Sequence, residues 1–303
     1  MTEKKIAIFI PCYNAARTIE STLSSVEEAV KKMDFPVPVY IYDDGSKDDS
    51  LGIARRTWKN TSPLFIEQNP QNMGERRTTN TAFGHLSASF DWVYIIHADD
   101  IVKPDWLSVL YEQIRLADDE KCFTIWSSFD SMDDKTGLSE PGDNSGAITK
   151  RDRTEEEKKQ YIINLYCSWH ISGAAINLRL FHQLEGFDVS MAQFGDTDFF
   201  TRGLLAGFGD VYLSRTLTHY RVISNSVSSV SVKTNRDIKE IIYIIKKFSP
   251  VLDTSQRRQL QSNLTRIALR RAIKWLLKLN FSNFFFCLNV SLYKTNDPKY
   301  SPQ

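Results

Sequence analysis

Cysteine is scarce in this chain of 303 residues, and no long apolar run is present. The four cysteines, Cys12, Cys122, Cys167 and Cys287, are far apart and form no CxxC pair, which argues against a zinc cluster and against a disulfide framework. No stretch approaches membrane-spanning length, and the apolar run near the N-terminus is too short for the core of a signal peptide. We therefore expect a cytoplasmic protein with reduced thiols.

Net charge is also nearly absent, but the two signs are unevenly distributed. The chain has 38 Lys and Arg against 37 Asp and Glu, a net charge of +1. Residues 233–303 contain 14 basic and 4 acidic residues, a net +10, whereas residues 1–232 contain 24 basic and 33 acidic residues, a net −9. A basic tail on an acidic body indicates an anionic partner. Membrane lipid ranks above nucleic acid, because no known nucleic-acid-binding module is visible.

The first half of the chain alternates short apolar runs with periodic segments. Strands are predicted at 5–10, 37–42, 64–67 and 92–97, and helices at 18–33, at a segment ending at 58, and at 78–89. This alternation predicts βαβ units with a buried parallel sheet, whose ligands bind at the carboxyl ends of the strands. Further on, helices are predicted at 104–116 and 154–166, and strands at 123–127 and near 210–213. Residues 130–153 lack periodicity and fit either a lid or an ordinary surface loop.

Two adjacent carboxylates, Asp99 and Asp100 in the segment HADD, come directly after the fourth apolar run. Adjacent carboxylates repel each other unless a cation or several hydrogen-bond donors lie between them, so a divalent metal ion would remove the conflict. Capping of the following helix is the alternative role for this pair.

Several other polar motifs accompany HADD. In chain order they are IPCYN at 10–14, DDGS at 43–46, NMGERRTTN at 72–80, SWHISGAAI at 168–176, FGDTDFFTR at 194–202 and HYRVISNSVS at 219–228. In this order, over residues 5–229, they resemble the motifs of the GT-A-fold, family 2 glycosyltransferases. The resemblance implies an α/β fold: a Rossmann-like, mostly parallel mixed sheet flanked by helices.

The resemblance also implies a reaction and a domain organisation. The reaction is an inverting, Mg²⁺- or Mn²⁺-assisted transfer of a sugar from a UDP- or dTDP-sugar to a hydroxyl of a polysaccharide or lipid-linked oligosaccharide. Residues 1–232 would form the catalytic domain, with a nucleotide-sugar half at 1–103 and an acceptor half at 104–232. Residues 233–303 would form a basic, aromatic-rich helical extension with a closing loop at 219–228 before it.

Roles for individual residues follow from the same resemblance. The expected nucleotide-binding residues are Pro11, Tyr13, Asn14, Asp43, Asp44, Arg76 and Asp99. The expected metal ligands are Asp99, Asp100 and His219, the expected general base is Asp196, and the expected acceptor or sugar contacts are Trp169, His170, Asp198 and Arg202. Structural alternatives stay open: helix capping for the aspartates, solvation for the arginine, and buried packing for the Trp and His pair.

Two positions depart from the family pattern. His97 stands where many members have the first Asp of the metal motif, and Thr79 stands where many have Arg. These departures support a rival function, a catalytically inactive nucleotide-binding scaffold in a polysaccharide assembly complex. A nucleotidyltransferase is less compatible, because IPCYNAART lacks the Gly-rich signature with Lys that such an enzyme carries after its first strand.

The basic tail contains an amphipathic pattern. Arg266, Arg270, Lys274 and Lys278 fall four apart and so share one helical stripe, and we expect Leu269, Ile273 and Leu276 on the opposite side. A helix of this kind within 255–292 fits an anionic membrane surface at the inner face of the cell membrane. Packing of its apolar side on the catalytic domain, or on a second subunit of a homodimer, is the alternative.

Overall fold

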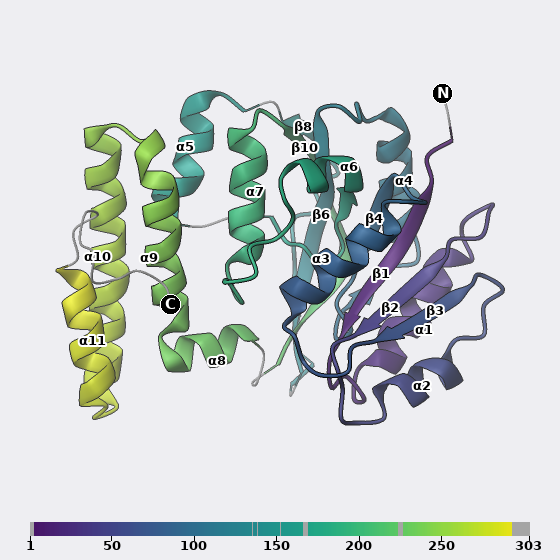
Figure 1. Ribbon diagram of the computed structural model, residues 1–303, viewed down its shortest axis with the longest axis horizontal. Helices are drawn as coiled ribbons and strands as arrows, with labels where there is room; N and C mark the ends of the chain where they lie inside the picture. Colours follow the sequence, from purple (N-terminus) through teal and green to yellow (C-terminus); the bar gives the residue numbers. More distant parts are fainter. Residues whose placement is uncertain are drawn as a thin grey trace. The chain divides into compact units, whose positions relative to one another are not determined.

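The structure is a computed structural model that describes residues 3–134, 136–137, 139–151, 153–165, 169–223 and 227–292. The chain divides into two compact units. The first comprises residues 1–152 and 169–223, and the second comprises residues 153–168 and 224–303. The first unit contains the sheet, and the second is helical (Figure 1).

The sheet of the first unit is mixed and mostly parallel. Its strands are β1 (Ile6–Cys12), β2 (Val39–Asp43), β3 (Leu64–Gln68), β4 (Trp92–Ile95), β5 (Ile101–Val102), β6 (Cys122–Asp133), β7 (Ser139–Glu140), β8 (Ile148–Arg151), β9 (Ala175–Asn177) and β10 (Gly209–Val222). They lie in the order β3-β2-β1-β4-β9-β6-β10-β5, with β7 paired to β6 and β8 paired to β10. β1 to β4 are parallel and so are β6 and β10, whereas β5, β7, β8 and β9 pair antiparallel. The predicted α/β fold is therefore confirmed.

Strand β1 is a continuous apolar run because helices cover both of its faces. Ile8 and Ile10 belong to a core with the buried residues of α1 (Ile19–Val30), α2 (Ser50–Thr57) and α4 (Trp106–Leu116). Phe9 points to the other face and contacts Phe83 of α3 (Glu75–Leu86), with 5.2 Å between ring centroids. On the same face, Phe83 contacts Phe181 of α6 (Leu178–Gln183), and Phe181 contacts Phe199 of α7 (Gly195–Leu205). Figure 1 shows α6 and α7 on the same side of the sheet as α3.

The later strands differ from the expected pattern. β10 runs from Gly209 to Val222, so residues 219–222 are strand where a loop is expected, and the supposedly irregular segment 130–153 contains the end of β6 together with β7 and β8. The physical reason is that β6 and β10 pair along most of their length. Ladder hydrogen bonds therefore stabilise polar residues whose own strand propensity is low. Residues 224–226 of the expected closing loop lie outside the described residues.

The described residues of the second unit form helices and no strand. They are α5 (Glu155–Asn164), α8 (Val227–Thr234), α9 (Arg236–Phe248), the 3₁₀ turn η1 (Ser249–Val251), α10 (Thr254–Leu277) and α11 (Phe281–Ser291). α10 packs against α11 and α5. No helix among the described residues is apolar over a length that would cross a bilayer. Cys12, Cys122 and Cys287 are buried, and Cys167 lies outside the described residues.

The expected position of the apolar stripe on α10 is wrong. The residues that α10 buries at four-residue intervals are Leu260, Leu264, Ala268 and Ala272. Leu269, Ile273 and Leu276 are exposed, as are the basic residues beside them. At 100° per residue, positions 269 and 273 lie next to 266 and 270 on the helix surface, not across from them. α10 therefore exposes apolar and basic side chains together.

Candidate functional site

The chain turns sharply after β4, and this turn holds three ionisable side chains. Ligand atoms of His97, Asp99 and Asp100 lie within 4.8 Å of one another. Asp100 is 1% exposed, and its Oδ1 accepts a hydrogen bond from the Arg221 backbone N–H at 2.9 Å. Its Oδ2 is buried and accepts no hydrogen bond of standard geometry from the described residues. A buried carboxylate oxygen that lacks a hydrogen bond of standard geometry, beside a second carboxylate, is an arrangement that a cation would complete.

The charges in this turn are unbalanced. Burial, and then the Asp100 carboxylate, raise the pKa of Asp99 to about 6, and burial also raises the pKa of Asp100. Burial alone would lower the pKa of His97, but Glu75, whose Oε1 lies 3.5 Å from His97 Nε2, raises it to about 9. His97 is therefore a cation at neutral pH, and Glu75 compensates its charge. The two aspartates keep much of their mutual repulsion.

These residues fit a hard divalent cation held by carboxylate oxygens, the ligands that Mg²⁺ and Mn²⁺ prefer. His97, which pairs with Glu75 at 3.5 Å, supplies the third side chain of this group. His219, an expected ligand, is not in this group: its Nδ1 lies 3.3 Å from Asp130 Oδ2.

The loop that leads into α3 is held by Asp44. Its carboxylate accepts hydrogen bonds from Asn69 Nδ2 (3.0 Å), Met73 N (2.8 Å), Gly74 N (2.8 Å) and Thr78 Oγ1 (2.9 Å). Gly74 has a φ of +92°, which glycine adopts without strain, and it places Glu75 at the start of α3. Asp43, also buried, accepts from Ser46 N at 2.8 Å and Gln68 Nε2 at 2.9 Å. Both expected base-binding carboxylates thus support the loops around them.

Replacing Asp44 by Asn should destabilise the first unit. The amide has one acceptor oxygen, and its NH₂ group would face either the Gly74 N–H or the donors of Met73 and Thr78, so at least one part-buried donor loses its partner. We expect a loss of about 3 kcal/mol in the free energy of unfolding, measured by urea denaturation. Asp34→Asn, which changes an exposed carboxylate, is the matched control. An Asp44→Asn midpoint equal to that of the control would contradict this role.

Arg76 connects the turn to α7. Its Nη1 lies 3.2 Å from Glu75 Oε1, and its side chain is buried. A Cβ placed on Gly195 would lie 2.8 Å from Arg76 Nε, so glycine at this position lets the first residue of α7 approach the arginine closely. Arg76 Nε makes no hydrogen bond among the described residues. A buried, unsatisfied cationic donor at this point is available to an anion.

Asp196 lies at the N-terminal end of α7, where its Oδ1 accepts from Thr197 N at 2.8 Å. The charge of Asp196 acts on both His170 and Tyr220, and the charge of Asp99 acts on the same two side chains. The carboxylates of Asp196 and of Asp99 therefore both lie near His170 and Tyr220.

Two of the expected acceptor contacts, Trp169 and His170, have different surroundings. Trp169 is 3% exposed, stacks on Phe200 and donates from Nε1 to Thr124 Oγ1 at 3.2 Å. These contacts correspond to the packing alternative. His170 lies between the rings of Phe129 and Tyr220, and burial lowers its pKa to about 4. Its Nδ1 is 2.9 Å from the Ser172 carbonyl, so the neutral ring carries its proton there.

Asp198 and Arg202 form a buried ion pair within α7. Arg202 Nε lies 2.8 Å from Asp198 Oδ2, and the Asp198 side chain is fully buried. Arg202 also donates to the carbonyls of Leu184 and of Gly186. The pair therefore joins α7 to the turn after α6, which is a structural function. Contact of Asp198 and Arg202 with a sugar stays a prediction.

The end of β1 supplies the remaining expected nucleotide contacts. Pro11 is buried in the strand, whereas Tyr13 is 48% exposed. Asn14 donates from its backbone N–H to Ser46 Oγ at 2.7 Å and accepts from Lys47 N at 2.8 Å. The loops after β1 and β2 are thus joined, and the exposed Tyr13 ring has a free face on which a base could stack.

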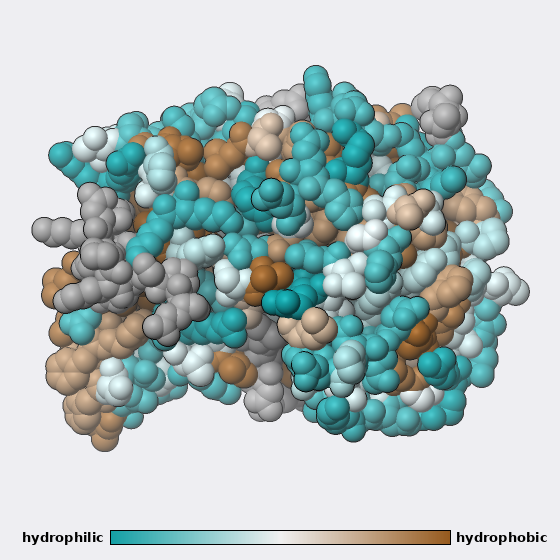
Figure 2. Space-filling view, in the orientation of Figure 1, coloured by the Kyte–Doolittle hydropathy of each residue, from teal (hydrophilic) through white to brown (hydrophobic). Residues whose placement is uncertain are grey.

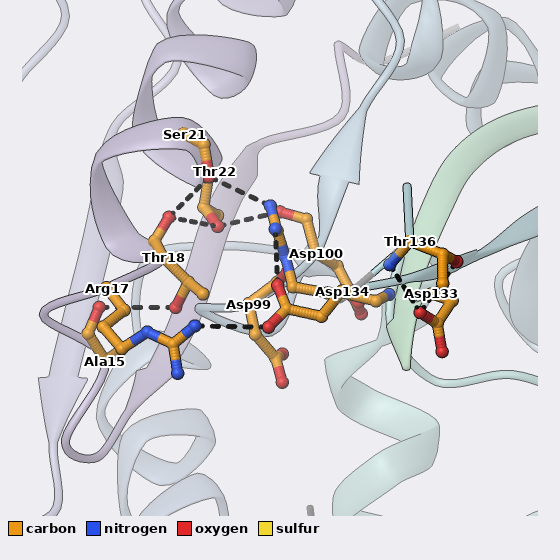
Figure 3. Close-up of polar contacts among 11 residues, drawn as sticks. Ala15, Arg17, Thr18, Ser21, Thr22, Asp99, Asp100, Asp133, Asp134 and Thr136 are labelled. Atoms are coloured by element: carbon orange, nitrogen blue, oxygen red, sulfur yellow. Dashed lines mark hydrogen bonds and ion pairs between the residues drawn. The ribbon is translucent and has the colours of Figure 1, made fainter. Parts of the chain in front are cut away.

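Arg221 braces the β4 turn from the end of β10. Its Nε donates to the Asp99 carbonyl at 2.8 Å, and its Nη1 and Nη2 reach Asp134 Oδ1 (3.1 Å) and Ser21 Oγ (3.2 Å). Thr22 of α1 donates to the Asp100 carbonyl at 2.8 Å. Figure 3 shows how Ser21, Thr22, Asp99, Asp100 and Asp134 converge from separate elements. The backbone that carries both aspartates is therefore fixed from two sides.

Replacing Arg221 by Met should weaken metal binding without removing a ligand. Loss of the contacts that orient metal ligands costs about 10- to 100-fold in metal affinity, and we expect a change in this range for Mn²⁺ measured by calorimetry. Arg17→Met is the matched control, because Arg17 also pairs with Asp134 at 3.3 Å but is exposed and is not hydrogen-bonded to Asp99 or Asp100. Equal Mn²⁺ affinities of the two variants would show that Arg221 does not position the turn.

Two residues of the site, Glu75 and Tyr220, were not among the predicted functional residues. Glu75 is the acidic residue within NMGERRTTN, next to two arginines, and its pKa is lowered to about 2 because Arg76 and His97 outweigh its burial. Tyr220 lies between His219 and Arg221 in HYRVISNSVS, a motif expected to form a closing loop and to supply His219 as a metal ligand. Glu75 could have been noticed in the sequence, because it is the only acidic residue in a segment expected to bind diphosphate. Nothing in the sequence indicates that Tyr220 belongs to the site.

Known proteins resemble this chain in sequence and in fold. The family model described as Glycosyl transferase family 2 matches residues 7–182. Chondroitin synthase of Escherichia coli is 23% identical over 248 residues, which is 75% of this chain but 33% of that protein, so the chain spans about a third of this curated relative. Staphylococcus aureus TarS 1–349 in complex with UDP-GlcNAc superposes with a TM-score of 0.65 at 17% identity, covering 95% of this chain and 80% of TarS. The mannosyltransferase PcManGT of Pyrobaculum calidifontis, in complex with GDP-Man and Mn²⁺, gives 0.58 at 17% identity, covering 99% and 89%. These likenesses confirm the GT-A fold.

Proposed function

Because the chain belongs to glycosyl transferase family 2, we propose that its site transfers a sugar from a nucleotide-sugar donor to a hydroxyl group of a saccharide acceptor, with inversion at the anomeric carbon. The observation that carries the proposal is the carboxylate pair Asp99 and Asp100 after β4, whose ligand atoms lie within 4.8 Å of one another and of His97. Asp99 and Asp100 would lie at the donor diphosphate, and Asp196 would lie where an acceptor hydroxyl arrives.

Asp196 is the proposed general base. The acceptor oxygen attacks the anomeric carbon, the bond from that carbon to the diphosphate oxygen breaks, the nucleoside diphosphate leaves, and the hydroxyl proton passes to Asp196. Asp196 lies in the first turn of α7, where it accepts a hydrogen bond from the Thr197 backbone N–H at 2.8 Å. His170, neutral because of its lowered pKa, and Tyr220 would orient the hydroxyl by hydrogen bonds.

Asp99 and Asp100 would hold Mg²⁺ or Mn²⁺. Such an ion, when bound, neutralises charge that develops on the leaving diphosphate. Arg76, buried and with an unsatisfied Nε, is placed to donate to a phosphate oxygen. Tyr13 would stack on the base of a UDP- or dTDP-sugar, and Pro11, Asn14, Asp43 and Asp44 would shape the pocket for it. His219 stays a proposed ligand only if donor binding moves β10, because its partner here is Asp130.

The acceptor is proposed to be a polysaccharide or a lipid-linked oligosaccharide. The curated relative named chondroitin synthase supports a polysaccharide, and the TarS and PcManGT complexes with UDP-GlcNAc and GDP-Man support a nucleotide-sugar donor. A cytoplasmic enzyme at the inner face of the membrane would meet both a soluble donor and a lipid-linked acceptor.

Release of nucleoside diphosphate from a panel of UDP- and dTDP-sugars, with and without Mn²⁺, tests the proposal. Donor hydrolysis or transfer that needs the metal supports it. The rival function, a catalytically inactive scaffold, rests on His97 and Thr79 at positions where the family has Asp and Arg. That rival predicts no turnover with any donor, even where calorimetry detects nucleotide binding.

A further inference from the structure

The C-terminal end of α10 is closed by a turn that normally requires glycine. The Leu279 backbone N–H donates to the Leu276 carbonyl at 2.9 Å, and the Asn280 N–H donates to the Trp275 carbonyl at 3.0 Å. These two bonds define a Schellman motif, whose left-handed position is usually Gly and sometimes Asn. Here it is Leu279, with a φ of +56°. A side chain with a Cβ is strained in this conformation.

The strain at Leu279 is not offset by packing. Leu279 is 74% exposed, and Leu277, two residues earlier, is 80% exposed. Further exposed apolar residues of α10 and α11 surround the turn: Leu269, Ile273, Leu276, Phe281 and Phe285. Figure 2 shows apolar side chains gathered at the lower left, where Figure 1 places the start of α11. We name this surface, residues 269–285, the hairpin tip.

The hairpin tip is also strongly basic. Residues 254–292 contain seven Lys and Arg and no Asp or Glu. Arg270, Lys274 and Lys278 are exposed and alternate with the apolar residues along the last turns of α10. Long basic side chains can extend outward from an apolar surface and place their charge at a polar boundary.

We propose that the hairpin tip inserts into an anionic lipid bilayer, with Leu277 and Leu279 among the acyl chains and Lys274 and Lys278 at the phosphate groups. An exposed apolar tip flanked by cations matches both parts of such a surface. Pairing of the tip with the tip of a second copy would place like charges against each other, and a nucleic acid would leave the leucine side chains in water. This surface does not depend on the transfer reaction proposed for the first unit.

Leu279→Asn separates this function from folding. Asn tolerates the left-handed conformation, so the variant should unfold at the same temperature as the wild type or at a higher one. Its partition coefficient on vesicles of phosphatidylcholine and phosphatidylglycerol should fall about tenfold in co-sedimentation, because a largely exposed leucine no longer leaves water on binding. Adding Leu277→Gln should lower binding further. Val251→Gln, which changes an exposed apolar residue of η1 outside the tip, should bind as the wild type does.

The charge component has its own test. Lys274→Gln with Lys278→Gln should lower binding to the anionic vesicles about tenfold or more, and should change binding to pure phosphatidylcholine vesicles little. The proposal is overturned if the wild type does not bind anionic vesicles, or if Leu279→Asn binds as tightly as the wild type. Two other results would assign the surface to a different partner, each in a wild type that does not bind vesicles. One is a dimer that Leu279→Asn dissociates, and the other is binding to a duplex oligonucleotide.

Discussion

Asp196→Asn is expected to lower the rate of sugar transfer by about 100- to 10,000-fold, the range that a positioned general base contributes. The amide cannot accept the hydroxyl proton, but it keeps the size of the side chain and an oxygen that can accept from Thr197 N. Donor binding should change little, because Asp196 is proposed to act on the acceptor. Initial rates at saturating donor, together with calorimetry of UDP binding in the presence of Mn²⁺, measure the two effects separately.

Asp34→Asn is the matched control for this prediction, since it makes the same chemical change at an exposed position in the first unit. A transfer rate of Asp196→Asn within a few-fold of this control would remove Asp196 from the reaction. In that case its position at the start of α7 would reflect stabilisation of the helix end only.

Asp100→Asn should lower turnover about 100- to 1,000-fold, because cation-assisted neutralisation of the leaving group is worth several kcal/mol. The substitution is conservative in one respect: its amide oxygen can still accept the hydrogen bond from the Arg221 backbone N–H. It replaces Oδ2, the buried oxygen without a hydrogen bond among the described residues, by a nitrogen that does not bind a hard cation.

Calorimetry with Mn²⁺ alone, and then with UDP and Mn²⁺ together, checks the cause of this loss. Asp100→Asn should weaken both binding events, whereas Asp130→Asn, which changes the carboxylate beside His219, should not weaken binding of Mn²⁺. If Asp130→Asn weakens it and Asp100→Asn does not, the metal belongs at His219 and not at the turn after β4.

The parts of the fold that the sequence could predict are those that local apolar periodicity determines. The run from Ile6 to Cys12 is apolar throughout because both of its faces are buried, and the periodic residues of α1, Ile19, Leu23, Val26 and Val30, are all buried as expected. The order of motifs along the chain also predicted the family and the GT-A fold. Neither inference needed contacts between residues distant in sequence.

Contacts between distant residues explain what the sequence did not reveal. The cation at His97 exists because Glu75, from the start of another element, lies 3.5 Å away. Asp44 binds the backbone of residues 73 and 74, which one-dimensional spacing could not indicate. The long β10 forms because β6 supplies its hydrogen bonds. On α10, the burial of Ala268 and Ala272 in place of Leu269 and Ile273 shows that neighbouring helices, and not hydrophobicity alone, select the buried face.

The central claim is that Asp99 and Asp100 bind a metal ion at the donor diphosphate while Asp196, in the same site, acts on the acceptor. Titration of UDP into the wild type, Asp100→Asn and Asp196→Asn, each with and without Mn²⁺, tests this claim most directly. We predict that Mn²⁺ strengthens UDP binding at least about tenfold in the wild type and in Asp196→Asn, and that this gain disappears in Asp100→Asn. UDP affinity that is the same with and without Mn²⁺ in the wild type, or an equal loss in both variants, would contradict it.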